Sequence, residues 1–316
     1  MLSRIGNSLF WMGRYLERAE HIARFTRVQF MSSVDAPVGQ SRETVLASIL
    51  EMSANRPGYF AAHPELHDEA VLTYTTIAEN NPFSILAYLN MVRENARGAR
   101  DSISIELWES INSFYHRMNA FAEAGFHSAE IEYFTKRMEE SSYVIKGHID
   151  NTLLRNEVWM LLSLDMHLER AVQVCLILLT KLKDIEKLDA AKQGGAVETY
   201  QWMTTLQSIE SFDMFMRCQK TSPTKHTVLD FLLFDSAFPK SIAFSLACVK
   251  QYIEGIPFQE DKKKGSLNFI AGKLACHYQY NTIEDIETSP VEFLETTLQN
   301  IYDLAHLLDV KYLKYN

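Results

Sequence analysis

The residues of this sequence best suited to chemistry are two glutamate–arginine pairs. The tetrapeptide Leu-Glu-Arg-Ala occurs at residues 16–19 and again at 168–171, 152 positions later in a chain of 316 residues. Both copies lie in apolar helical runs, where an unpaired charge is costly to bury. Paired carboxylates beside arginines can bind an anionic or amino-bearing ligand or a metal ion between two elements. They can equally fix the register of two packed helices without doing chemistry, and the sequence leaves both interpretations open.

The first pair belongs to a polar stripe with the spacing of one helical face. The stripe consists of Arg14, Glu17, Arg18, His21 and Arg24. Adjacent residues on a helix point about 100° apart, so Glu17 cannot easily pair with Arg18. If the two halves pack about a pseudo-twofold axis, we expect reciprocal pairs, with Glu17 meeting Arg170 and Glu169 meeting Arg18.

A second set of charged candidates lies further along the first half. It consists of Arg93, Glu94, Arg97, Arg100 and Asp101. The spacing predicts that the three arginines share one helical face with Ser104 and that Asp101 meets Arg97 one turn away. The aligned positions of the second half hold Lys250 and Gln251, so we expect any functional surface here to be confined to the first half.

Further echoes extend the duplication beyond the tetrapeptide. Residues 81–86 resemble residues 238–243, which sets Ser84 against Ser241, and residues 46–50 more weakly resemble residues 202–206. Three landmarks in the same order at nearly constant offset predict duplicated half-domains. We expect a first half at 1–150 and a second half at 151–316 that form one compact unit.

Apolar periodicity predicts helices almost throughout, with no segment of strand-like alternation. Only eight prolines and twelve glycines interrupt the pattern. Asn81 followed by Pro82 predicts a helix cap with proline at the first helical position. The expected fold is an all-α helical bundle of two duplicated halves about a pseudo-twofold axis. Its expected helices are 3–32, 42–54, 67–79, 82–123 with a break near Gly98 or Ser102, 127–152, 154–187, 197–220, 225–234, 238–254, 266–280 and 290–313.

Composition and short motifs exclude several function classes. A net charge of −9 argues against nucleic-acid binding, because phosphate contacts need clustered Lys and Arg. The longest apolar stretch, 171–179, is shorter than the ~18 residues that a membrane span needs. Four widely spaced cysteines and charges near the start fit a cytoplasmic protein. We find no nucleophile motif that would indicate hydrolase chemistry and no signal for a particular cofactor.

Two histidine groupings resemble metal ligands only in part. His63 and His67 are four residues apart, but Pro64 between them predicts a turn that leads into a helix. Glu17, Glu20 and His21 provide part of a di-iron ligand set, but no Glu-x-x-His motif is present on two helices. We therefore predict no metal site.

The last predicted helix carries an aromatic stripe. Tyr302, Tyr312 and Tyr315 accompany His306 and Lys311. Such a stripe either packs into the core or docks on a second copy of the chain to form a homodimer.

Taken together, the motifs resemble the bacterial Alpha-E domain family, a helical family with a Glu-Arg motif. The resemblance is carried by residues 1–4, 11–20, 81–84, 93–101 with 108–109, and the second copy of the motif. Residues 161–166 depart from it, because relatives carry a Gly-Arg pair there and this chain has Met166 where the first half has Arg14.

The resemblance implies a family without an established activity. Its genes tend to lie beside those for circularly permuted ATP-grasp proteins and transglutaminase-like peptidases. This context implies an accessory protein of a peptide-ligation or peptide-modification system. The chain lacks a Gly-x-x-x-x-Gly-Lys phosphate loop, so we do not expect nucleotide chemistry in it. The alternative is a small-ligand or metal-binding enzyme with a site between the halves, around the Glu-Arg motifs.

Overall fold

Long runs of helix formers without proline produce the two longest helices of the chain. The computed structural model describes residues 3–33, 41–53, 55–188, 195–256 and 263–313. The helices α1 (Ser3–Ser32) and α8 (Glu157–Glu186) each span 30 residues and contain the two Glu-Arg motifs. Fifteen α-helices and no strand occur in these ranges, so the all-helical prediction is confirmed.

The remaining helices are shorter, and several end at residues that sequence periodicity does not reveal. Their bounds are α2 Arg42–Met52, α3 Arg56–Ala62, α4 Asp68–Thr76, α5 Ile85–Gly98, α6 Ile105–Ala124, α7 Ile131–Thr152, α9 Ala196–Ser208, α10 Phe212–Gln219, α11 Lys225–Phe234, α12 Ile242–Gly255, α13 Leu267–Tyr280, α14 Ile283–Ile286 and α15 Pro290–Leu308. The predicted helix 197–220 is divided at Glu210, and α15 ends in a π-helical turn over Asp309–Leu313. The short helices α3 and α14 were not predicted.

Serine N-caps determine where α5 and α6 begin. The Ser84 side chain accepts a hydrogen bond from the Ala87 N–H, and Ser104 does the same for Leu107. The predicted cap at Asn81 and Pro82 is therefore wrong. The amide of Asn81 instead donates to the Tyr74 carbonyl and accepts from the Phe83 N–H, which stabilises the preceding turn.

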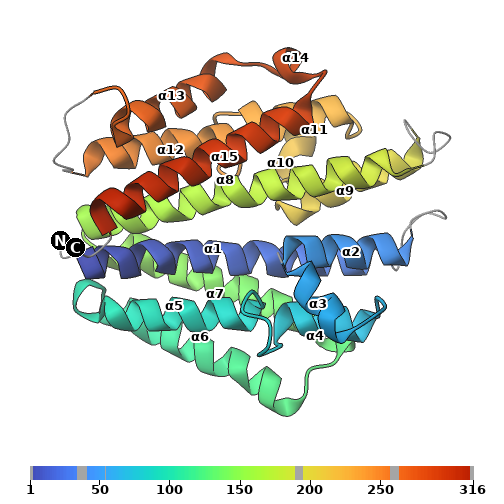
Figure 1. The fold of residues 1–316 in the computed structure, drawn as a ribbon, viewed down its shortest axis with the longest axis horizontal. Coiled ribbons are helices and arrows are strands. Elements are labelled where there is room, and N and C mark those ends of the chain that lie inside the picture. Colours follow the sequence, from blue (N-terminus) through green and yellow to red (C-terminus); the bar gives the residue numbers. More distant parts are fainter. Residues whose placement is uncertain (1–2, 34–40, 54, 189–194, 257–262, 314–316) are drawn as a thin grey trace.

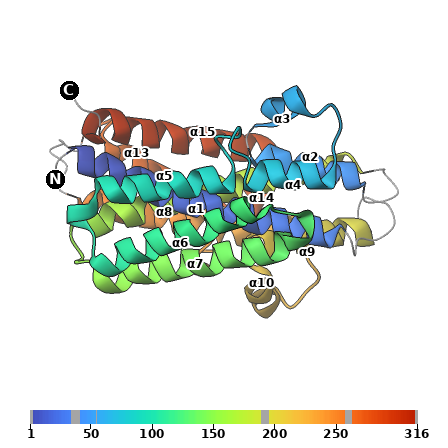
Figure 2. The same cartoon turned by 90° about the horizontal axis from the view of Figure 1, so that it is seen from below.

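The two motif helices lie side by side at the centre of the molecule. Contacts join Gly13 to Asp165, Arg18 to Glu169 and Gln29 to Lys181, so α1 and α8 run in the same direction. Figure 1 shows α5 and α6 on one side of this pair and α12, α13 and α15 on the other. Seen from below, α5, α6 and α7 cover the first side (Figure 2). Each motif helix is therefore buried between its own neighbours and its counterpart.

A glycine permits the close approach of α1 and α8. A Cβ atom added at Gly13 would lie 3.1 Å from the Leu162 carbonyl oxygen and 3.2 Å from the Asp165 Cβ. The charged stripe of α1 begins at the next residue, Arg14, and therefore lies in direct contact with α8. Within the described ranges, no helix combines the length and the apolar character needed to cross a membrane.

Candidate functional site

The carboxylate of Glu169 receives two arginines from the opposite helix. Arg18 donates to both of its oxygens, at 2.7 and 2.9 Å, and Arg14 donates to one of them at 2.8 Å. The amide of Gln173 adds a hydrogen bond of 2.8 Å from the same helix. Glu169 is 0% exposed, so its charge is balanced by α1 and not by water.

The Glu17 carboxylate shows the reciprocal arrangement. Arg170 donates to Glu17 at 2.6 Å, and the Lys146 ammonium of α7 lies 2.5 Å from its second oxygen. The predicted reciprocal pairs, Glu17 with Arg170 and Glu169 with Arg18, are therefore both present. The environments differ, because Glu169 is neutralised by two arginines of α1, whereas Glu17 is neutralised from α7 and α8.

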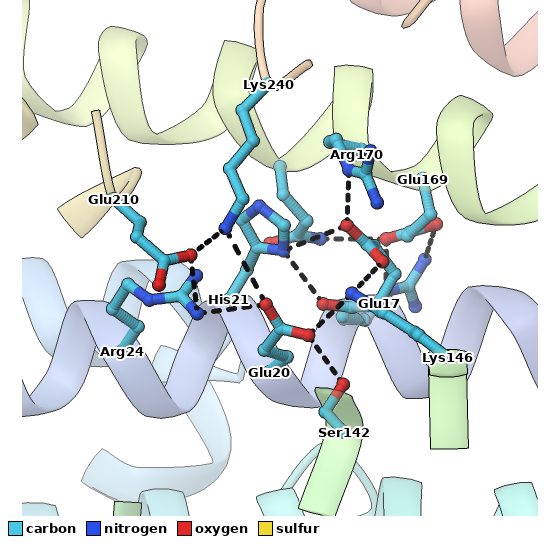
Figure 3. Close-up of polar contacts among 12 residues, drawn as sticks. Glu17, Glu20, His21, Arg24, Ser142, Lys146, Glu169, Arg170, Glu210 and Lys240 are labelled. Carbon is cyan, nitrogen blue, oxygen red and sulfur yellow. Dashed lines mark hydrogen bonds and ion pairs between the residues drawn. The ribbon is translucent and has the colours of Figure 1, made fainter. Parts of the chain in front are cut away.

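The polar cluster continues along α1 from Glu17 to Arg24. Figure 3 shows Glu20 between Lys146, Ser142 and Arg24, with Lys240 above it. The Arg24 guanidinium in turn reaches Glu139, Tyr143 and Glu210. We call this set the Glu–Arg network. It comprises Arg14, Glu17, Arg18, Glu20, His21, Arg24, Glu139, Ser142, Tyr143, Lys146, Glu169, Arg170, Glu210 and Lys240.

Charge pairing keeps the buried carboxylates ionised. Burial alone raises the pKa of Glu17, but Arg170 and Lys146 outweigh it and hold the pKa well below its ordinary value. For Glu169, Arg18 and Arg14 outweigh burial and lower the pKa to about 2. A carboxylate held this firmly in its ionised form is a poor general base at neutral pH. It is suited to holding cationic side chains in place.

Several buried groups at the α1–α8 contact have no hydrogen-bond partner among the described residues. The His21 Nδ1–H donates to the Glu17 carbonyl oxygen, but the Nε2 of the ring has no partner. Both carboxyl oxygens of Asp165 are likewise unpartnered. Burial lowers the pKa of His21 to about 4 and raises that of Asp165 well above its ordinary value. His21 is therefore neutral in the folded protein near pH 7, and burial favours the protonated form of Asp165.

Sequence reasoning found only part of this network. Arg14, Glu17, Arg18, His21, Glu169 and Arg170 were predicted as site residues, and the structure brings all six together. The contributions of Lys146, Lys240, Glu139 and Glu210 were missed. These four lie on other segments and have no local motif, so only their packing against α1 identifies them.

The arginine-rich segment does not form the predicted surface. Because α5 ends at Gly98, Arg100 and Asp101 leave the helical face of Arg93, and Ser104 is used as a cap. Arg97 pairs with Glu94 instead of Asp101. Arg93 donates to Asn112 of α6 and stacks on Tyr115, whereas Arg100 stacks on Trp108.

The other candidate groups have local roles. His67 directly precedes α4, so the predicted turn from His63 into a helix is confirmed. No cluster of three or more His, Cys, Asp or Glu side chains with metal-binding geometry occurs in the described part of the chain. The helix α15 packs on α8 and leaves Tyr302 partly exposed, while Tyr315 lies outside the described residues.

Comparisons with known proteins identify a family but no characterised relative. The family model of Alpha-E, "a predicted alpha-helical domain with a conserved ER motif", matches residues 1–313. Similar proteins include the uncharacterised proteins Mb2597 of Mycobacterium bovis and Rv2567 of Mycobacterium tuberculosis. Each is 22% identical over 275 residues, which is 80% of this chain and 30% of the relative. The chain thus spans about 30% of the length of these curated relatives. No solved structure matches.

Proposed function

This chain belongs to the Alpha-E family, and we propose that it is a non-catalytic binding protein in which the Glu–Arg network fixes the position of α1 against α8. The observation that carries the proposal is the state of the three central carboxylates. Glu17, Glu20 and Glu169 are each 0% exposed, and each is neutralised by two or more cationic side chains. A substrate could reach these groups only if the network opened.

The proposal includes two duplicated halves, 1–150 and 151–316, related by a pseudo-twofold axis that runs along α1 and α8. The reciprocal ion pairs support it, as do the equal lengths of α1 and α8. The helices α5 and α12 are also equally long, at 14 residues, and are capped in the same way by Ser84 and Ser241. In this arrangement the network is the joint between the halves.

For the partner, we propose a circularly permuted ATP-grasp protein or transglutaminase-like peptidase of a peptide-ligation or peptide-modification system. This choice rests on the family resemblance and not on a contact. The test is sedimentation velocity of the purified chain mixed with a circularly permuted ATP-grasp protein from the same organism. We expect a stable complex, and no complex with an ATP-grasp ligase from an unrelated gene neighbourhood. Independent sedimentation of both proteins, with unchanged amide-bond formation by the ligase, would contradict the proposed role.

The second candidate is a small-ligand or metal-binding enzyme with a site between the halves. Asp165 favours it, because a fully buried carboxyl group with two unpartnered oxygens is uncommon in a folded protein. A thermal-shift screen with nucleotides, amino acids, peptides and metal ions tests this candidate. Stabilisation that disappears in Asp165→Asn would favour the enzyme over the binding protein.

A further inference from the structure

Beside the Glu210 end of the Glu–Arg network, a hollow lies between the end of α1 and the α9–α10 corner. Its volume is about 760 Å³, within the ~300–1,000 Å³ typical of ligand pockets. We call it the methionine groove, because Met31, Met203 and Met214 line it together with Val28 and Phe212. Met31 and Met214 are 39% and 42% exposed, an unusual position for side chains that could have been buried.

Methionine walls suit a flexible apolar ligand. The unbranched thioether side chain adapts its shape to different apolar groups, and it recurs on surfaces that bind varied peptides. The groove therefore offers an adaptable apolar contact rather than a cavity of fixed shape.

The charges around the groove favour a cationic group in the ligand. Three charged residues line the groove: Arg27, Glu210 and Asp213. Arg27 forms an ion pair with Glu139, and Glu210 forms ion pairs with Lys240 and Arg24. Asp213 has neither a hydrogen bond nor an ion pair with any described residue. The exposed carboxylate of Asp213, in the first turn of α10, thus remains free to pair with a cation at the edge of an apolar wall.

The corner that positions Asp213 is held in a conformation unusual for its residue type. Glu210, between α9 and α10, has a φ angle of 57°, in the left-handed region that favours glycine. Its carboxylate accepts hydrogen bonds from Tyr143 and Lys240. These bonds tie the corner that carries Asp213 to the Glu–Arg network, so the charged edge of the groove is held in place while its methionine wall stays adaptable.

From this combination we infer that the methionine groove binds an extended peptide segment of a partner protein, in which a lysine or arginine lies between apolar side chains. The basic group pairs with Asp213, and the apolar side chains pack on Met31, Met203 and Met214. The inference rests on the proposed binding function and specifies the partner segment that this function would use.

Methyl NMR of the full chain with ¹³C-labelled methionines tests the inference. The probe is the peptide acetyl-Leu-Lys-Leu-amide, with acetyl-Leu-Glu-Leu-amide as the matched control. We expect the lysine peptide to shift the resonances of Met31, Met203 and Met214, assigned by single Met→Leu variants. The glutamate peptide should bind at least tenfold more weakly.

Two variants separate charge pairing from folding. Asp213→Asn should weaken the lysine peptide at least fivefold while leaving the methionine spectrum of the free protein unchanged. Glu292→Gln alters an exposed carboxylate in the first turn of α15 and should leave peptide binding unchanged.

Three results would overturn the inference: no shift at millimolar lysine peptide, equal binding of both peptides, or shifts confined to methionines outside the groove. A shift of Met31 and Met214 with protein concentration alone would also overturn it, because a second copy of the chain would then occupy the groove. None of these results bears on the ATP-grasp complex, which is measured separately by sedimentation.

Discussion

The Glu–Arg network and the arginine-rich segment at 93–101 are made of the same residue types in opposite surroundings. In the network, Glu17 and Glu169 are fully buried, and their arginines come from the other motif helix. In the segment, the Glu94 and Arg97 side chains are 40% and 68% exposed and pair within one turn of α5. Water competes for the second pair and not for the first.

This difference determines how much each charge contributes to stability. Exposed ion pairs contribute roughly 0–1 kcal/mol, because solvent screens them and ordering long side chains costs entropy. Removing one member of a buried pair costs about 3–5 kcal/mol, because the remaining charge has no water to solvate it. A sequence rich in Arg and Glu therefore does not by itself identify the charges on which the fold depends.

The largest effect is expected at Glu169. Glu169→Gln leaves Arg14 and Arg18 facing each other without a counter-charge, and we expect a loss of about 3–5 kcal/mol in the free energy of unfolding. Urea denaturation followed by circular dichroism measures this loss. A loss below ~1 kcal/mol would mean that the network does not hold the helices together.

A triple variant shows whether Glu169→Gln destabilises the protein only because it leaves buried arginines without a counter-charge. Arg14→Met, Arg18→Met and Glu169→Leu together replace the buried ions by apolar side chains of similar volume. We expect it to recover most of the stability lost in Glu169→Gln, as observed generally when whole buried ion clusters are replaced. If the triple variant is no more stable than the single one, the charges have a role beyond electrostatic balance.

The second-largest effect is a loss of stability in acid. It begins near pH 6.5, above the pH range in which carboxylates titrate, because it is caused by His21. Burial lowers the pKa of His21 from 6.5 to about 4, so the unfolded chain binds a proton more readily than the folded one. The contribution of neutral His21 to the free energy of unfolding is fully present above pH 6.5 and is lost as the pH falls toward 4. The lowered pKa of Glu169 adds a second loss between about pH 4.5 and 2.

A His21→Asn variant isolates the loss of stability between pH 6.5 and 4 from the loss that Glu169 causes at lower pH. His21 accounts for on the order of 3 kcal/mol between pH 7 and 4, since each pKa unit corresponds to ~1.4 kcal/mol. Urea midpoints at pH 7.5, 5.5 and 4 should fall in the natural chain and fall less in the variant. Burial also lowers the pKa of His167, so the urea midpoint of the variant should still depend on pH, but less steeply. Equal slopes in both proteins would show that His21 is not buried in its neutral form.

The repeated Leu-Glu-Arg-Ala motif made part of the network predictable from sequence. A motif repeated in two apolar helices requires a partner for each charge, and reciprocal pairing provides one for each without further residues. The prediction could not extend to Lys146 and Lys240. Neither lysine belongs to a local motif, and the role of each follows only from how α7 and the segment that precedes α12 pack against α1.

The errors in helix boundaries have a common physical origin. Apolar periodicity continues across residues 98–104, yet Ser104 forms a better helix start than helix interior, so the chain breaks there. A break was predicted near Gly98 or Ser102, and α5 does end at Gly98, but the shared face of the three arginines was extended across that break. The end of α5 at Gly98 separates Arg100 and Asp101 from Arg93, so the predicted shared face is wrong.

A smaller effect is expected from the crossing of α1 and α8. Gly13→Ala places a methyl group 3.1 Å from the Leu162 carbonyl oxygen and forces the helices apart by a few tenths of an ångström. We expect a loss of about 1–2 kcal/mol, typical of overpacking. The matched control is Gly147→Ala in α7, where nothing lies within 4 Å of the added Cβ. That change should stabilise the protein by about 0.5–1 kcal/mol through helix propensity.

The smallest effect is expected in the arginine-rich segment, and it completes the comparison. Arg97→Ala removes only an exposed pair with Glu94, so its unfolding free energy should stay within about 0.5 kcal/mol of the natural chain. Arg93→Ala should cost more, about 1 kcal/mol, because Arg93 also bonds Asn112 and stacks on Tyr115. Urea denaturation of both variants beside Glu169→Gln measures the series. If Arg97→Ala destabilised the protein as much as Glu169→Gln, burial could not explain the difference between the two regions.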